Sequence, residues 1–89
     1  MKITDATVQT VRQENERCRK AFGERGLDID EFDTHNTCND WVAYICGYAG
    51  RGSDMFRNRQ EGLGFREAMV KSANLAMAAI EAFDAGHCK

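Results

Sequence analysis

Apolar residues recur at alternating intervals of three and four along three stretches of this sequence, and the chain contains no proline. This period puts apolar side chains on one face of an α-helix, and proline is the residue that most readily breaks a helix. The pattern therefore predicts an all-α fold with three main helices. The first helix is expected over residues 5–22 and the third over residues 65–84. The second is expected to begin after the capping residue Thr37, and its apolar stripe runs to Met55.

Residues that favour helix ends flank these stretches. Thr4 and Thr37 precede the first and the second stretch, and a threonine there accepts hydrogen bonds from the free amides of a helix N-terminus. Asp40 follows Thr37 by three positions, which is a weaker form of the capping box. Gly23 and Gly26 are expected to end the first helix.

The stretches between the helices are predicted to be loops. Residues 27–36 are rich in acidic side chains, but their spacing does not match a calcium-binding loop. Residues 57–64 form the second connector, in which Gly62 and Gly64 mark turns. The four cysteines include no Cys-x-x-Cys pair, and the one zinc ligand set that can be assembled, from His35-x-x-Cys38 and His87-Cys88, lacks the closely paired spacing of zinc sites. We expect neither a metal ion nor another cofactor.

The third predicted helix has two apolar sides. One side is lined by Phe65, Met69, Ala73, Ala76, Ile80 and Phe83, and the other by Ala68, Leu75, Ala79 and Ala82. Three helices do not easily cover such a helix, so it is either central or shared with another subunit. We therefore expect a homo-oligomer. Gly86 is the expected C-terminal cap of this helix.

Composition and charge exclude several classes of function. The 89 residues make one domain, spanning residues 1–89. A net charge of −2 gives no bulk attraction to duplex nucleic acid or to an anionic membrane. No apolar run approaches the ~20 residues that span a bilayer, and the N-terminus lacks the apolar core of a signal peptide. We therefore expect a cytoplasmic protein with no membrane partner and no nucleic-acid duplex partner.

Two features have both a structural and a functional interpretation. Asn15 interrupts the stripe of the first helix, where it either sets the register of helix packing or contacts a ligand. Gly47, Gly50 and Gly52 crowd the second helix, although each glycine costs a helix up to ~1 kcal/mol relative to alanine. Their small size permits the close approach either of another helix or of a flat ligand.

The sequence resembles the MazG-like, all-α nucleotide pyrophosphohydrolases. The resemblance is carried by Phe22-Gly23, His35-Asn36, Trp41-x-Ala43 and the alanine-rich helix Phe65–Ala82. It implies a MazG-like helical bundle. In that family a Glu-Glu-x-x-Glu run, which follows the tryptophan segment, holds the Mg²⁺ that bridges to the nucleotide's phosphates.

The residues that would hold this metal are replaced here. Relative to the family's pattern, the three glutamate positions are occupied by Gly47, Tyr48 and Arg51. On the last helix Glu67 matches a metal-binding glutamate, but Lys71 stands at the second ligand position. One carboxylate does not hold Mg²⁺, which needs several oxygen ligands. The resemblance therefore implies a member that has lost hydrolysis.

The replacements point to direct binding of a nucleotide. Arg51 and Lys71 are expected to point into one inter-helix site and to contact phosphate without a metal. Trp41, Tyr44 and Tyr48 are suited to stack on a base. The other residues expected to bind the ligand are Asn36, Arg57, Asn58, Arg59, Arg66 and Glu67.

Three functions remain as hypotheses. The first is a phage-encoded homo-oligomer in the host cytosol that binds a nucleotide or cyclic-nucleotide signal without cleaving it, and so acts as an anti-defence sponge. The second is a divergent Mg²⁺-dependent nucleoside triphosphate pyrophosphohydrolase. The third is a helical interaction protein that inhibits a host protein through its last helix.

Overall fold

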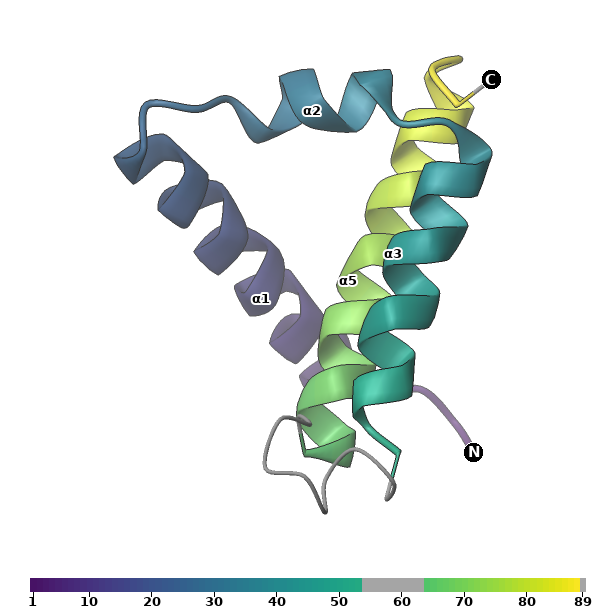
Figure 1. The fold of residues 1–89 in the computed structure, drawn as a ribbon. Helices are drawn as coiled ribbons and strands as arrows, with labels where there is room; N and C mark the ends of the chain where they lie inside the picture. Colours follow the sequence, from purple (N-terminus) through teal and green to yellow (C-terminus); the bar gives the residue numbers. More distant parts are fainter. Residues whose placement is uncertain (54–63, 89) are drawn as a thin grey trace.

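The computed structural model describes residues 1–53 and 64–88, which contain four α-helices (Figure 1). These are α1 (Asp5–Glu24), α2 (Ile29–His35), α3 (Cys38–Arg51) and α5 (Phe65–Asp84). Residues 1–53 and 64–88 contain no β-strand. The all-α prediction is therefore confirmed, but the helices are more numerous than the three expected, because α2 forms where the sequence predicts a loop.

The four helices form an open frame rather than a closed bundle. The helices α3 and α5 run antiparallel and side by side, α1 leans away from α5, and α2 crosses from α1 to the α3–α5 pair (Figure 1). Within the described part of the chain, α3 packs on α5 and on no other helix. The space between α1 and the α3–α5 pair is where the main cavity described below lies.

The helix α1 begins as its sequence predicts and ends two residues later than predicted. The Oγ1 atom of Thr4 accepts a hydrogen bond from the amide of Thr7 at 3.3 Å. At the other end Gly26 has a φ of +72°, a conformation that favours glycine. The amide of Leu27 then donates to the carbonyl of Phe22 at 2.9 Å, which closes the helix.

The short helix α2 corrects the prediction of a loop over residues 27–36. Its N-cap is Asp28, whose carboxylate accepts from the amide of Asp30 at 3.0 Å. Two contacts hold it to α1: the rings of Phe22 and Phe32 meet edge to face with centroids 5.7 Å apart, and Arg19 donates twice to Asp30 at 2.8 Å. The acidic residues that suggested a solvated loop instead stabilise the positive end of a helix.

The helix α3 has the predicted capping box at its start but ends earlier than predicted. The amide of Asp40 donates to Thr37 Oγ1 at 3.1 Å, and the amide of Thr37 donates to the carboxylate of Asp40 at 2.9 Å. The helix ends at Arg51 with Gly52 as its C-cap, whereas the apolar stripe predicts a helix to Met55, which lies outside the described residues. A Cβ atom on Gly52 would lie 2.8 Å from Cβ of Ala68 on α5.

The space around Gly47 and Gly52 bears on whether their small size serves helix packing. Gly52 is small because α5 passes close to it, which supports the helix-packing interpretation at this position. A Cβ atom on Gly47 would meet nothing within 4 Å, so helix packing does not account for that glycine.

The helix α5 spans Phe65–Asp84, as predicted from its apolar period. Gly86 follows it with a φ of +86°. The amide of Gly86 donates to the carbonyl of Phe83 at 2.9 Å and that of His87 to Ala82 at 3.0 Å. Gly86 therefore terminates the helix one residue beyond its C-cap, which is Ala85.

Few side chains are buried within the described residues. The buried apolar ones are Val11, Trp41, Ala68 and Ala82. Phe65, Ile80 and Phe83, predicted on one apolar side of α5, are 60%, 59% and 63% exposed. The chain on its own therefore leaves much of that side uncovered. None of the described helices is long and apolar enough to cross a membrane.

Candidate functional site

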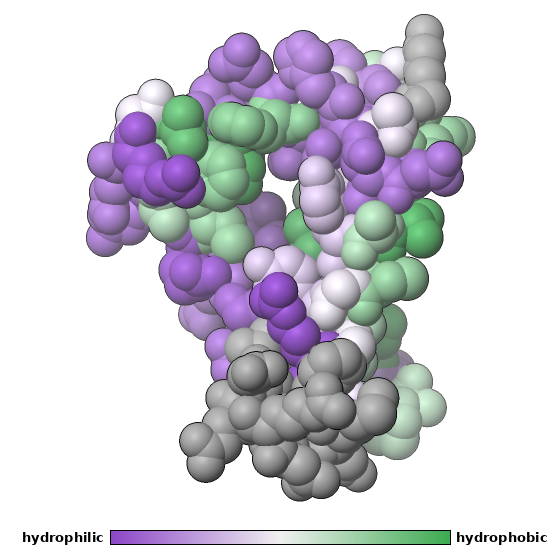
Figure 2. Space-filling model, viewed as in Figure 1, coloured by the Kyte–Doolittle hydropathy of each residue, from purple (hydrophilic) through white to green (hydrophobic). Residues whose placement is uncertain are grey.

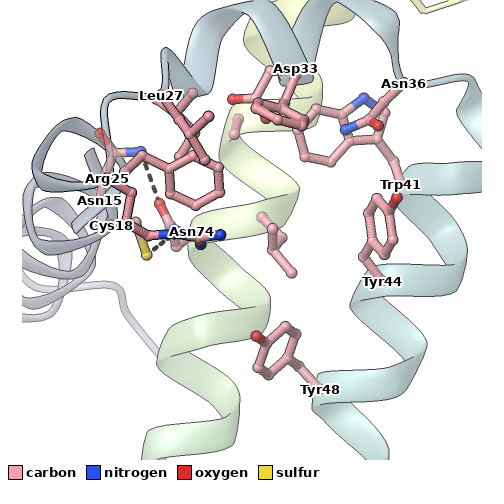
Figure 3. A pocket seen from close by; sticks show the side chains of 15 residues that line it. Asn15, Cys18, Arg25, Leu27, Asp33, Asn36, Trp41, Tyr44, Tyr48 and Asn74 are labelled. Carbon is pink, nitrogen blue, oxygen red and sulfur yellow. Dashed lines mark hydrogen bonds between the residues drawn. The ribbon is translucent and has the colours of Figure 1, made fainter. Parts of the chain in front are cut away.

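The frame encloses a cavity of about 410 Å³ that all four described helices border (Figure 3). Its lining residues are Asn15, Cys18, Phe22, Arg25, Leu27, Ile29, Phe32, Asp33, Asn36, Trp41, Tyr44, Tyr48, Asn74, Leu75 and Ala78. We call it the aromatic cavity, because five of these side chains carry aromatic rings.

One wall of the aromatic cavity is a column of rings on α3. Trp41, Tyr44 and Tyr48 succeed one another along the helix, and their side chains extend toward the cavity (Figure 3). Their spacing of three and four keeps them on one face of the helix. Trp41 is only 3% exposed, and its Nε1 atom has no hydrogen-bond partner among the described residues. A buried indole N–H without a partner is uncommon in folded proteins.

The opposite wall carries a pair of amides that joins α1 to α5. Asn15 Nδ2 donates to Asn74 Oδ1 at 2.9 Å, and Asn74 is 8% exposed. Asn15 thus has the inter-helix role that its interruption of the apolar stripe suggested, while it also lines the cavity. Asn74 was missed by the sequence analysis, although it is the one amide in an otherwise alanine-rich stretch of α5.

The aromatic cavity also contains ionisable side chains that sequence reasoning did not select. Asp33 projects from α2, and burial, with a further contribution from the charge of Asp30, raises the pKa of its carboxyl group against the opposing effect of Arg19. Arg25 lines the cavity with its guanidinium 5.9 Å from the centroid of the Phe22 ring. No motif distinguishes these two residues from the other charges around Gly26, so only the path of the chain reveals them.

A second cavity, of about 460 Å³, lies between α1 and α5 and is more polar. Glu14 is its central charge: it accepts from Arg17 at 2.7 Å and from Lys71 at 3.2 Å. The hydrogen bond from Arg17, with further contributions from Cys18 and Lys71, lowers the pKa of Glu14 to about 2 against the opposing effect of burial. Arg66 and Glu67 also line this cavity, which we call the charged cavity.

The residues predicted to form one site are distributed over these two cavities. Trp41, Tyr44, Tyr48 and Asn36 line the aromatic cavity, whereas Lys71, Arg66 and Glu67 line the charged cavity. Cys18 connects the two, because it lines the first and donates to Glu14 in the second at 3.3 Å. The residues Arg57, Asn58 and Arg59 lie outside the part of the chain that the structure describes.

The two cations that were expected to share a phosphate are placed differently from each other. The guanidinium of Arg51 lies over the ring of Tyr48, 5.0 Å from its centroid, but Arg51 is not among the residues that line the aromatic cavity. Lys71 is bound to Glu14 in the charged cavity, with 18% of its side chain exposed. Lys71 therefore shares a carboxylate with Arg17, which balances one of their two charges and which the sequence analysis did not anticipate.

No group of three or more His, Cys, Asp or Glu side chains within residues 1–53 and 64–88 is arranged to hold a metal ion. Glu67, the one residue that matches a ligand of the resembling family, lies in the charged cavity with Lys71. Because this finding covers only the described residues, the expectation of a metal-free protein stays a prediction.

The fold and cavities define a small all-α protein with a ligand-sized aromatic cavity. Comparison of the chain with models of protein families, with curated proteins and with solved structures finds no match. The resemblance to the MazG-like family therefore remains an interpretation of the sequence.

Proposed function

We propose that this chain binds a nucleotide or a cyclic nucleotide, with the base in the aromatic cavity, and does not hydrolyse it. The observation that carries the proposal is the lining of this cavity, where three rings from α3 face the Asn15–Asn74 pair across about 410 Å³. Cavities of ~300–1,000 Å³ with apolar walls and a few polar groups are typical of small-molecule sites.

The lining suits a nucleobase in two respects. Each ring that stacks on a base contributes ~1–3 kcal/mol, and Tyr44 and Tyr48 have the position for it. An amide both donates and accepts hydrogen bonds, so Asn36 and Asn74 complement the edge of a base.

One cation lines the aromatic cavity, and a second lies next to one of its rings. Arg25 is part of its lining, and Arg51 stacks on Tyr48. In the charged cavity Glu14 neutralises one of the two charges of Arg17 and Lys71, so that a phosphate there has to compete with the carboxylate. The proposal therefore assigns direct phosphate contact to Arg51 and a secondary role to Lys71.

The resemblance to MazG-like proteins supplies the remainder of the proposal. A homo-oligomer of phage origin, whose metal-binding glutamates are replaced by Gly47, Tyr48 and Arg51, would hold a nucleotide signal without cleaving it. Such a protein acts by sequestration, and its effect depends on abundance and affinity rather than on turnover. The exposed apolar side chains of α5 support the oligomer as well as the alternative of a protein partner.

The proposal is tested by calorimetric titration with nucleoside triphosphates and cyclic nucleotides in the presence of EDTA. At least one should bind, and Tyr44→Ala should weaken it about 5- to 150-fold, which corresponds to the loss of ~1–3 kcal/mol of stacking. Arg51→Ala should weaken it about 10- to 150-fold through loss of a charge-assisted contact. Phe65→Ala is the control, because Phe65 is equally aromatic and exposed but does not line the cavity.

Three outcomes would contradict the proposal. Magnesium-dependent turnover that disappears in Glu67→Gln would establish the pyrophosphohydrolase alternative. Binding that EDTA abolishes would show that a metal mediates the contact. If no nucleotide binds, the interaction-protein alternative becomes the better explanation of the exposed apolar residues.

A further inference from the structure

One carboxylate of the aromatic cavity has no structural task. Nearby, Asp28 caps α2 and Asp30 accepts two hydrogen bonds from Arg19. Asp33, three residues further along α2, is half-buried and lines the cavity, and its carboxylate forms no hydrogen bond or ion pair with the described residues. A half-buried carboxylate without a donor costs free energy, so its position needs an explanation outside the packing of α2.

Arg25 is the cation of the same cavity. It is the C-cap of α1 and its guanidinium lies 5.9 Å from the centroid of the Phe22 ring. Arg25 and Asp33 are the two charged residues of the lining, and among the described residues they form no ion pair with each other. One side chain comes from the end of α1 and the other from α2 (Figure 3). The lining therefore offers a ligand one group of donors and one pair of acceptors.

A ligand in the aromatic cavity can reach the carboxylate of Asp33. This residue also lines a neighbouring cavity of about 330 Å³, which shares Asn15 and Ala78 with the aromatic cavity. Figure 2 shows the centre of the frame hollowed below α2. Asp33 therefore lies where two open cavities meet, rather than behind other side chains.

Guanine is the common base whose edges match these two charges. Its N1–H and its 2-amino group are adjacent donors, and a carboxylate can accept from both. Its O6 and N7 atoms are adjacent acceptors, to which an arginine donates in a bidentate manner. Adenine and cytosine present one donor beside an acceptor, and uracil presents one donor between two acceptors, so none of them offers two donors to a carboxylate.

We propose that the aromatic cavity selects guanine nucleotides, with Asp33 accepting from N1 and from the 2-amino group of the base and Arg25 donating to O6 and N7. This inference rests on the proposed function, because it names the base of the nucleotide. A cationic ligand for Asp33 fits less well, since Arg25 in the same lining would repel it.

The first test compares bases on the wild-type chain by calorimetric titration in EDTA. The probes are guanosine, inosine and adenosine triphosphates, and cyclic GMP with cyclic AMP. The guanine member of each set should bind at least about 10-fold more tightly than the adenine member, through loss of charge-assisted hydrogen bonds in the latter. Inosine triphosphate, which lacks the 2-amino group, should also bind about 10-fold more weakly than guanosine triphosphate.

The second test changes the carboxylate and keeps its shape. Asp33→Asn should weaken guanosine triphosphate about 10- to 150-fold. It should strengthen xanthosine triphosphate, because the new amide donates to O2 of xanthine while its oxygen accepts from N1–H. A residue that only supports the fold would not exchange one base for another. Glu31→Gln is the matched control: it removes the same charge from an exposed residue of α2 that does not line the aromatic cavity, and it should leave the preference unchanged.

The outcomes separate this inference from the proposed function. If adenine nucleotides bind as tightly as guanine nucleotides, or if Asp33→Asn keeps the guanine preference, the inference is overturned and nucleotide binding stands. If no nucleotide of any base binds, both are overturned. Should Asp33→Asn fail to fold, the wild-type comparison of guanosine, inosine and adenosine triphosphates decides.

Discussion

At the scale of single residues, Glu14 determines what the charged cavity offers to a ligand. Its carboxylate lies 2.7 Å from Arg17 and 3.2 Å from Lys71, and the thiol of Cys18 donates to it. The carboxylate therefore occupies the position that a phosphate bound by those two cations would take. An anion can enter only by displacing Glu14 or by binding beside it, which explains why Lys71 is a weaker candidate than the sequence suggested.

The lowered pKa of Glu14 predicts how stability depends on pH. The pKa falls from 4.5 to about 2 on folding, so the contribution of this carboxylate is complete above pH 4.5 and is lost as the pH falls toward 2. Glu14→Gln should reduce the free energy of unfolding by about 1–3 kcal/mol near neutral pH. The difference from wild type should shrink between pH 4.5 and 2, as measured by urea denaturation. A difference that is constant over that range would show that Glu14 acts through packing alone.

Two glycines of the second predicted helix should respond to alanine in opposite directions. Gly52→Ala brings a methyl group to 2.8 Å from Cβ of Ala68, so it should destabilise the chain by about 1–3 kcal/mol. Gly47→Ala meets open space within α3, so it should stabilise by up to ~1 kcal/mol. Urea denaturation of the two variants measures both changes in the free energy of unfolding. Equal effects would mean that α3 and α5 do not approach as closely as described.

At the scale of the helices, the sequence predicted the elements whose signals are local. The caps at Thr4 and Thr37 and the full extent of α5 were found, because capping and apolar period depend on neighbouring residues. The end of α3 at Arg51 was not predicted, because the apolar stripe continues to Met55, whereas the close approach of Ala68 to Gly52 is a contact between residues far apart in the sequence. The helix α2 was missed because its acidic residues resemble those of a solvated loop.

The stability of α2 should depend on its N-cap residue, Asp28. Asp28→Ala removes the hydrogen bond to the amide of Asp30, and loss of such a cap costs ~0.5–2 kcal/mol. Amide hydrogen exchange over residues 29–35 should accelerate, because α2 has seven residues and no other side-chain cap at its start. Asp28→Ser, which keeps an acceptor oxygen, is the control and should exchange nearly as slowly as wild type. Unchanged exchange in Asp28→Ala would mean that the contacts of Phe32 with Phe22 and of Asp30 with Arg19 hold α2 without the cap.

At the scale of the whole molecule, the candidate site was predicted only in part. The column of rings on α3 follows from helical period, so Trp41, Tyr44 and Tyr48 were chosen correctly as neighbours. The separation of Lys71 from that column was not predictable, because it depends on how far α1 leans from α5 and on the side chain that Glu14 presents between them. Asn74, Asp33 and Arg25 were missed because their place in the cavity is set by the path of the chain.

The small buried set also determines how this chain can change in evolution. Few described positions are buried, and substitutions at exposed positions usually change the free energy of unfolding by less than about 0.5 kcal/mol, so most of the surface can vary. Two pairs of residues are more constrained. Gly52 and Ala68 share one small space, and Asn15 and Asn74 share one hydrogen bond. Related chains should therefore vary widely at most sites while these two pairs change together or not at all.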